Sequence, residues 1–238
     1  MSAADSKVVG GWLWVVGERL SFPNHQPPTT NHQPPATLGR GLDWVERLLV
    51  LALYGWLVAR LLGKYLADGG VVNLLLLPSE GMVVVFLLVR RPAAAISRRP
   101  GEWLLALTAT ISPMLVNTGI GEPLIPMAIA AFLLLMGLVV QVWAKLTLGR
   151  SLGLVPAHRG LKLSGPYRYV RHPMYAGYLL SHLAYLLVNP TWWNFAVYGL
   201  CYGLQFPRLL AEERLLRRDP GYRVYESAVR SRLIPGVF

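Results

Sequence analysis

The residues best suited to chemistry are concentrated between positions 165 and 177. This segment reads GPYRYVRHPMYAG and places three tyrosines, two arginines and one histidine directly before an apolar stretch. Pro173 suits the first turn of a following helix, where its missing N–H is not needed. Backbone N–H groups at that helix start, with Arg171 and His172 beside them, could hold a carboxylate, and the tyrosine rings could meet a cationic sulfonium or an adenine. Tyrosine and arginine are also typical of a membrane interface, so the residue types alone leave both interpretations open.

A second group of charged residues lies at 208–213, where the sequence reads RLLAEE. Arg208 and Glu212 are four positions apart and therefore share one face of a helix. They could form an ordinary ion pair on that face. In the functional interpretation, Glu212 instead holds a cationic or hydroxyl group of a cofactor, and Arg208 orients an anionic acceptor.

Several other chemistries are excluded or unsupported. Cys201 is the only cysteine, which excludes disulfides within the chain and cysteine-based metal sites. The two copies of NHQPP, at 24–28 and 31–35, contain histidines, but their prolines favour an extended linker that does not preorganise a metal site. We therefore predict no bound metal. The turn at 119–121 lacks the strand and helix of a nucleotide-binding βαβ unit, so we interpret its glycines as part of a loop.

The composition places these motifs in a membrane protein. Hydrophobic residues make up 54% of the chain and charged residues only 15%, whereas a soluble domain needs more polar side chains to cover its surface. The net charge is +11, and basic residues are concentrated from Lys145 onwards. Between apolar segments, such an excess indicates the cytoplasmic face of a membrane, so we do not expect nucleic-acid binding.

Four apolar stretches predict the membrane spans, at about 44–66, 71–89, 102–117 and 123–146. Four arginines between 90 and 99 mark the loop at 90–101 as cytoplasmic, and the same rule places everything after Lys145 in the cytoplasm. Glu80 lies inside the second span, where an acidic side chain is a functional hypothesis by default. The sequence names no partner for it.

Shorter elements are expected on either side of these spans. Two apolar stretches at 174–188 and 192–206 predict a helical hairpin that enters and leaves from the cytoplasm, followed by charged helices at 207–218 and 222–232. At the N-terminus, 8–17 predicts an interfacial helix with its tryptophans at headgroup depth. The predicted fold is thus an all-α, polytopic membrane helical bundle with four spans, a C-terminal hairpin and cytoplasmic C-terminal helices.

The two motifs together resemble the isoprenylcysteine carboxyl methyltransferase and phospholipid methyltransferase superfamily. The resemblance covers about 145–236 and includes the tail residues Tyr222 and Tyr225. It implies an S-adenosylmethionine (SAM) site closed by the C-terminal helices and a lipophilic acceptor, and it implies a substrate-orienting, catalytic role for Arg208. The residues implied to bind the cofactor are Leu161, Tyr167, His172, Pro173, Met174, Tyr175, Glu212 and Glu213.

Composition and hydropathy divide the chain into an N-terminal interfacial and proline-rich part at 1–42 and transmembrane helices at 43–146, and the resemblance implies a SAM-binding methyltransferase region at 147–238. The expected partners are SAM, the acceptor and membrane lipids. The acceptor group, whether carboxylate, amine or thiol, and the oligomeric state stay open. Two alternatives remain, an NADPH-dependent membrane reductase of the sterol type and a non-enzymatic accessory protein that retains the fold.

Overall fold

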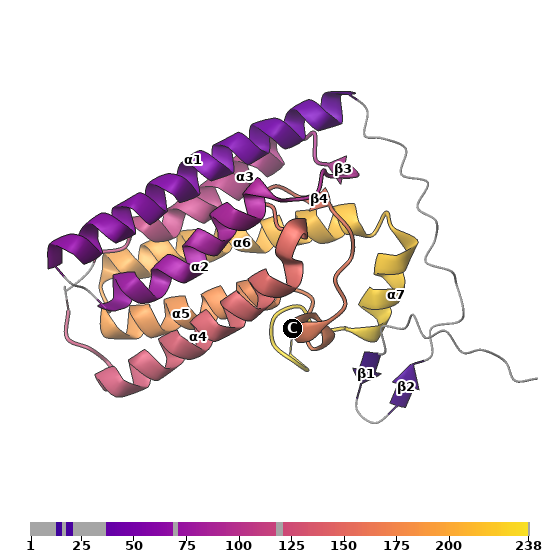
Figure 1. Ribbon diagram of the computed structural model, residues 1–238. Coiled ribbons are helices and arrows are strands. Elements are labelled where there is room, and N and C mark those ends of the chain that lie inside the picture. The colour runs from indigo at the N-terminus through magenta and orange to yellow at the C-terminus, as the bar shows by residue number, and fades with distance from the viewer. Residues whose placement is uncertain (1–12, 16–17, 21–36, 69–70, 118–120, 238) are drawn as a thin grey trace, which may run out of the picture.

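The computed structural model describes residues 13–15, 18–20, 37–68, 71–117 and 121–237. Six helices run side by side as a bundle, and a seventh short helix, α7, lies across one end of it (Figure 1). The helices are α1 (Thr37–Asp68), α2 (Val71–Leu88), α3 (Pro100–Ile111), α4 (Met127–Leu148), α5 (Pro173–Val188), α6 (Trp192–Leu216) and α7 (Pro220–Ala228). The predicted helical class is therefore confirmed.

Short elements connect the helices. Three 3₁₀ turns are η1 (Ser112–Leu115), η2 (Gly149–Ser151) and η3 (Gly165–Arg168). Two antiparallel strand pairs are β1 (Leu13–Val15) with β2 (Glu18–Leu20), and β3 (Ala95–Ile96) with β4 (Ala157–His158). Because β3 pairs with β4, the predicted loop at 90–101 lies against the basic segment that follows α4.

Helices α1 to α4 lie at the four predicted spans, but α3 ends at Ile111, before the predicted end at 117, and the 3₁₀ turn η1, which contains Pro113, follows it. Within the described residues, one continuous helical stretch, Met127–Ser151, has both the length and the mean hydropathy needed to cross a bilayer. This finding supports one span directly.

Three sequence predictions differ from the structure. Where an interfacial helix is predicted at 8–17, the described residues 13–15 form strand β1; both NHQPP copies lie outside the described residues. The predicted separate helix from 207 is instead the continuation of α6, which passes through Pro207. Proline removes one backbone hydrogen bond, a loss that a helix supported by neighbouring helices tolerates. The last helix, predicted to reach 232, ends at Ala228.

Helices α4 and α5 approach closely where two glycines face one another. A Cβ atom added to Gly137 would lie 2.3 Å from Ser181 Oγ, and one added to Gly177 would lie 2.8 Å from the Gly137 carbonyl oxygen. Such contacts leave no room for a side chain, as is typical of helix pairs that pack through small residues. The pair fixes the start of α5, and with it the 165–177 motif, against α4.

A buried ion cluster joins three segments that are far apart in the sequence. Glu46 of α1 pairs with Arg90, with an Oε2–Nη1 distance of 3.0 Å, and also with Arg159, while Asp43 contacts both arginines. The other Glu46 oxygen, Oε1, accepts hydrogen bonds from the backbone N–H groups of Leu154 (2.7 Å) and Val155 (3.0 Å). The start of α1 therefore positions the loop at 152–155.

A second buried ion pair gives Glu80 the partner that the sequence did not name. The Nζ atom of Lys145 on α4 lies 3.0 Å from Glu80 Oε1 and 2.8 Å from Ser79 Oγ, and Lys145 is fully buried. Lys145 thus neutralises an acid inside the bundle, whereas the charge count treats it as part of the cytoplasmic excess.

Candidate active site

The 165–177 motif begins with a tight turn that only glycine allows. Gly165 has φ +59°, and a Cβ atom there would lie 2.6 Å from Thr147 Oγ1. The turn η3 buries Pro166 and Tyr167 and leads to His172, which is the N-cap residue of α5. Pro173 occupies the first turn of α5, as predicted.

The backbone at the end of the motif is held by the C-terminal tail. The N–H of Arg171 donates to the Ser231 carbonyl (3.0 Å), and the N–H of His172 donates to the Arg232 carbonyl (2.9 Å). The Arg171 guanidinium pairs with Glu213 and Glu226. The backbone N–H groups of Arg171 and His172 and the Arg171 guanidinium therefore already have partners within the chain.

Glu213 is the centre of a buried charge cluster. Its carboxylate contacts His172 Nε2 (3.3 Å), Arg171 Nε (3.1 Å), Arg217 Nη2 (3.3 Å) and Arg232 Nε (3.0 Å). Burial alone would raise the pKa of Glu213, but the hydrogen bonds from His172 and Arg232 and the charge of Arg171 lower it to about 2. The carboxylate therefore stays ionised, and it fixes the His172 ring and the tail.

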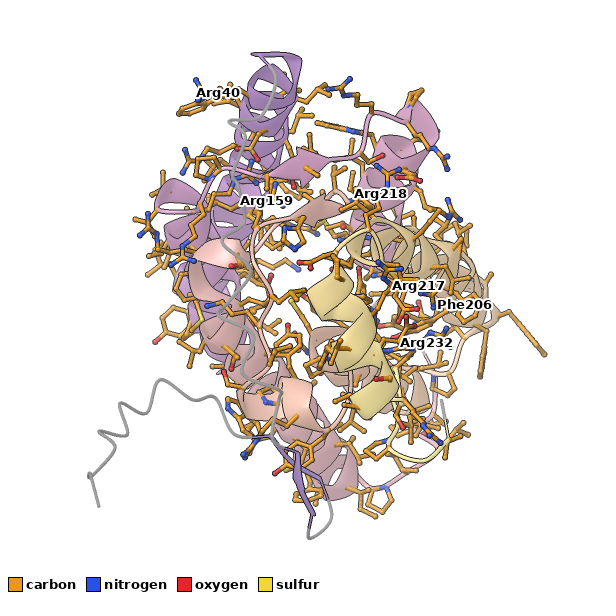
Figure 2. The ribbon with its side chains drawn as sticks, turned by 90° about the vertical axis from the view of Figure 1, so that its right-hand side faces the viewer. Arg40, Arg159, Phe206, Arg217, Arg218 and Arg232 are labelled. Carbon is orange, nitrogen blue, oxygen red and sulfur yellow. The ribbon has the colours of Figure 1, made fainter. Side chains whose placement is uncertain are left out.

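Most of the predicted cofactor residues line one cavity beside this cluster. Leu161, Tyr167, His172, Met174, Tyr175 and Glu212 all line it. Pro173 and Glu213 do not, because Pro173 forms the buried helix start and Glu213 lies within the charge cluster. We call this space the cofactor cavity, after the role that the sequence predicts for the residues lining it. The end of the bundle at which it lies, with α7 across it, faces the viewer in Figure 2.

The cofactor cavity also contains residues that the site prediction did not include. Tyr222 and Tyr225 of α7 line it. The Tyr225 hydroxyl donates to the Tyr167 carbonyl at 2.7 Å. By contrast, the Tyr222 hydroxyl is buried and has no hydrogen-bond partner in the part of the chain that the structure describes. A buried polar group of this kind calls for a partner, and a bound ligand is one.

A second cavity, of about 300 Å³, lies among the helices of the bundle. Its wall is mostly aliphatic, with Val50 and Leu57 of α1, Val83 of α2 and Leu138 of α4 among its residues. We call it the bundle cavity. The polar side chains that reach it include Glu80, Gln141, His182, Gln205 and Arg208.

Arg208 lines the bundle cavity and Glu212 lines the cofactor cavity, and the two side chains do not contact each other directly. Among the ion pairs of the described residues, none joins them, so the ordinary ion pair does not form. Arg208 lies over the Tyr175 ring, 5.5 Å from its centroid, and its Nη2 donates to the Leu154 carbonyl at 2.9 Å. The Tyr175 hydroxyl donates to Glu212 at 3.3 Å. Tyr175 therefore connects the two charged residues.

The comparison with protein families gives a match over part of the chain. Residues 125–220 match the phospholipid methyltransferase family. This segment belongs to that family. A search of curated proteins found no significant match. The phospholipid methyltransferase segment contains every predicted site residue and the wall between the cavities, and it supports a membrane methyltransferase in general. It ends before Tyr222 and Tyr225, so α7 adds two cavity residues outside the matched segment.

Proposed function

We propose that the chain is a multi-pass membrane methyltransferase that transfers a methyl group from SAM to a lipophilic acceptor at the cytoplasmic face. The observation that carries the proposal is the meeting of two cavities at one wall. Gly153, Leu154, Met174 and Tyr175 line both the aromatic, polar cofactor cavity and the apolar bundle cavity. A water-soluble donor and a lipid-soluble acceptor can approach one another across this wall.

The exposed surface supports a bundle embedded in lipid. Large apolar side chains are exposed on several helices, among them Leu104 (64%), Phe132 (61%) and Leu200 (54%), which is typical of a surface that contacts a membrane. The ion cluster holds the start of α1 beside Arg90 and Arg159, so the basic loops and α7 lie at one end (Figure 1). The positive-inside rule assigns that end to the cytoplasm. We propose four spans, a hairpin of α5 and α6, and a methyltransferase region at 147–238.

The residues of the cofactor cavity fit the chemical groups of SAM. Tyr167, Tyr175 and Tyr222 offer aromatic rings for an adenine or a sulfonium. Glu212 offers a carboxylate for an ammonium or ribose hydroxyl group, and the unpaired Tyr222 hydroxyl offers a further hydrogen bond. We propose that Pro173 and Glu213 act behind these residues, by holding the motif and the tail in place, and that Glu213 orients His172, which lines the cavity.

The cofactor cavity measures about 90 Å³, whereas small-molecule sites usually measure about 300 to 1,000 Å³. We propose that binding opens it by moving α7 and the segment at 159–163. These two elements pack together through a small apolar cluster, in which Leu161 and Leu163 lie against Tyr222 and Tyr225. A small cluster of this kind can separate at lower cost than the main core.

The mechanism that this site supports relies on alignment. When bound, SAM would supply a methyl group that is attached to a sulfonium sulfur, and the resulting thioether would be the leaving group. The chain's own residues must hold the acceptor in line and exclude water, and such positioning can supply roughly 7–11 kcal/mol. Arg208 is fixed by Leu154 and Tyr175 and lines the bundle cavity, while its Nε atom has no hydrogen-bond partner in the described residues. We propose that it orients an anionic group of the acceptor.

The proposal is tested by replacing Glu212, whose carboxylate is proposed to bind the cofactor. Glu212→Gln removes one charge-assisted hydrogen bond, which contributes about 1.5–3 kcal/mol, so the affinity for SAM should fall roughly 10- to 100-fold. Calorimetry on the detergent-purified protein measures this affinity. Methyl-labelled SAM incubated with the protein and a membrane lipid extract identifies the labelled acceptor.

Glu122→Gln is the matched control, because Glu122 is exposed in the connection between α3 and α4, outside the lining of both cavities. It should bind SAM like the unmodified protein. Equal SAM affinity in both variants would contradict the assigned site. Binding of NADPH in place of SAM would favour the reductase alternative, and tight SAM binding without a labelled product would favour the accessory protein.

A further inference from the structure

A third cavity, of about 400 Å³, lies at the same end of the bundle but apart from the cofactor site. It is formed by the segment at 93–99, the first turn of α3 and the last turns of α6. Four arginines line it, which are Arg98, Arg99, Arg214 and Arg218. We call it the arginine pocket. It shares no lining residue with the cofactor cavity or the bundle cavity.

One acid holds part of this pocket in place. Glu102 Oε1 lies 3.6 Å from Arg99 Nη1 and 3.4 Å from Arg214 Nη1, and Ser97 donates to the other carboxylate oxygen. Glu102 is the only acidic residue among those that line the pocket. It fixes two guanidinium groups but cannot neutralise four.

The other two arginines supply the excess charge. Arg98 and Arg218 are exposed, and no ion pair within the described residues involves either of them. Figure 2 shows Arg218 at the end of the bundle that carries α7. Guanidinium groups bind phosphate through paired hydrogen bonds. The pocket is therefore suited to a phosphate group.

The position of the pocket relative to exposed apolar side chains indicates which kind of molecule carries that phosphate. Leu104 of α3 is 64% exposed, and Phe206 of α6 is 48% exposed. At 1.5 Å per residue, they lie about 7 Å along α3 from Arg99 and about 12 Å along α6 from Arg214. The backbone positions of Arg99 and Arg214 thus lie one to two helical turns from exposed apolar side chains on the same helices, so a phosphate group in the pocket would leave the acyl chains of its lipid beside that apolar surface.

We propose that the arginine pocket binds the phosphate group of an anionic membrane phospholipid. The lipid would be held in addition to the methyl acceptor, with its acyl chains along α3 and α6. The same segment pairs with the loop beside the cofactor cavity, since Ser97 N–H donates to the Pro156 carbonyl and β3 pairs with β4. A bound lipid would therefore also hold that loop.

The test is a binding titration on the full chain in detergent, with fluorescent phosphatidylglycerol as the probe at 150 mM salt. In Arg98→Gln/Arg218→Gln, the affinity should fall roughly 10- to 30-fold, because each basic residue near an anionic lipid contributes about fivefold. The control is Arg223→Gln/Arg230→Gln, which removes the same charge from two exposed arginines outside the pocket. It should change the affinity less than threefold.

Competition separates the sources of phosphate. Unlabelled phosphatidylglycerol should displace the probe, and phosphatidylcholine or inorganic phosphate at the same concentration should not. Equal losses in the two double variants would overturn the proposal, since they would show attraction by overall charge. Displacement by inorganic phosphate as strong as that by the lipid would also overturn it, because the pocket would then be a site for free phosphate. The melting temperature of both double variants should be unchanged, which would show that a loss of lipid affinity does not result from misfolding.

Discussion

Glu46 provides the sharpest test of how the fold positions the site. It is 1% exposed, pairs with Arg90 and Arg159, and accepts hydrogen bonds from two backbone N–H groups of the loop at 152–155. Breaking a buried ion pair by removing one partner costs about 3–5 kcal/mol. Each buried N–H left without an acceptor adds about 1–3 kcal/mol.

Two substitutions separate these contributions. Glu46→Gln keeps an oxygen for the N–H groups of Leu154 and Val155 but removes the negative charge, so we expect a loss of about 3 kcal/mol. Glu46→Ala removes both, and its loss should be larger. For a chain of this size, 1 kcal/mol corresponds to about 2–4 °C in melting temperature, so Glu46→Gln should melt roughly 6–12 °C lower.

The assay is thermal unfolding of the detergent-purified protein, followed by SAM titration well below the melting temperature. Because Gly153 and Leu154 line both cavities, both variants should also bind SAM more weakly. Glu122→Gln is again the control. A shift in melting temperature below about 2 °C for Glu46→Gln would refute the ion-pair reasoning, and normal SAM affinity in Glu46→Ala would refute the positioning role.

Two further predictions concern the cofactor cavity and the charge cluster beside it. Tyr222→Phe should weaken SAM binding roughly 2- to 10-fold without lowering the melting temperature, because its buried hydroxyl has no partner in the described residues; a lower melting temperature with unchanged SAM affinity would contradict this. Glu213 has its pKa lowered to about 2 in the folded protein from an ordinary value of 4.5. Its contribution to stability is therefore present above about pH 4.5 and is lost as the pH falls toward 2. Melting temperatures from pH 6 to pH 3 should fall less steeply in Glu213→Gln than in the unmodified protein, and parallel curves would argue against the assignment.

The sequence predicts the local features of the site well. The residues of the cofactor cavity are implied by the family resemblance, whereas Pro173 at the start of α5 and the apolar stretches that follow it are predicted from residues close together in the sequence. Local spacing determines which residues a helix start or a helix face brings together, so such features can be predicted from a single sequence.

Contacts between distant segments are not predictable in this way. Glu46 and Leu154 are 108 positions apart, and nothing near either residue indicates that they meet. Lys145 resembles a charge at the end of a span, and only its packing against Ser79 and Glu80 reveals that it is buried. The continuation of α6 through Pro207 likewise depends on neighbouring helices, because local propensity predicts a break there.

The hydrogen bonds from Arg171 and His172 to the carbonyl groups of Ser231 and Arg232 have a consequence for biosynthesis. The motif and the tail are separated by about sixty positions, and α7 is made between them. During translation, the motif can pack into the bundle together with α5. The N–H groups of Arg171 and His172 can form their hydrogen bonds to Ser231 and Arg232 only after residue 232 has left the ribosome. The cavity that we propose for the methyl donor is therefore completed only after α7 and the tail have been made.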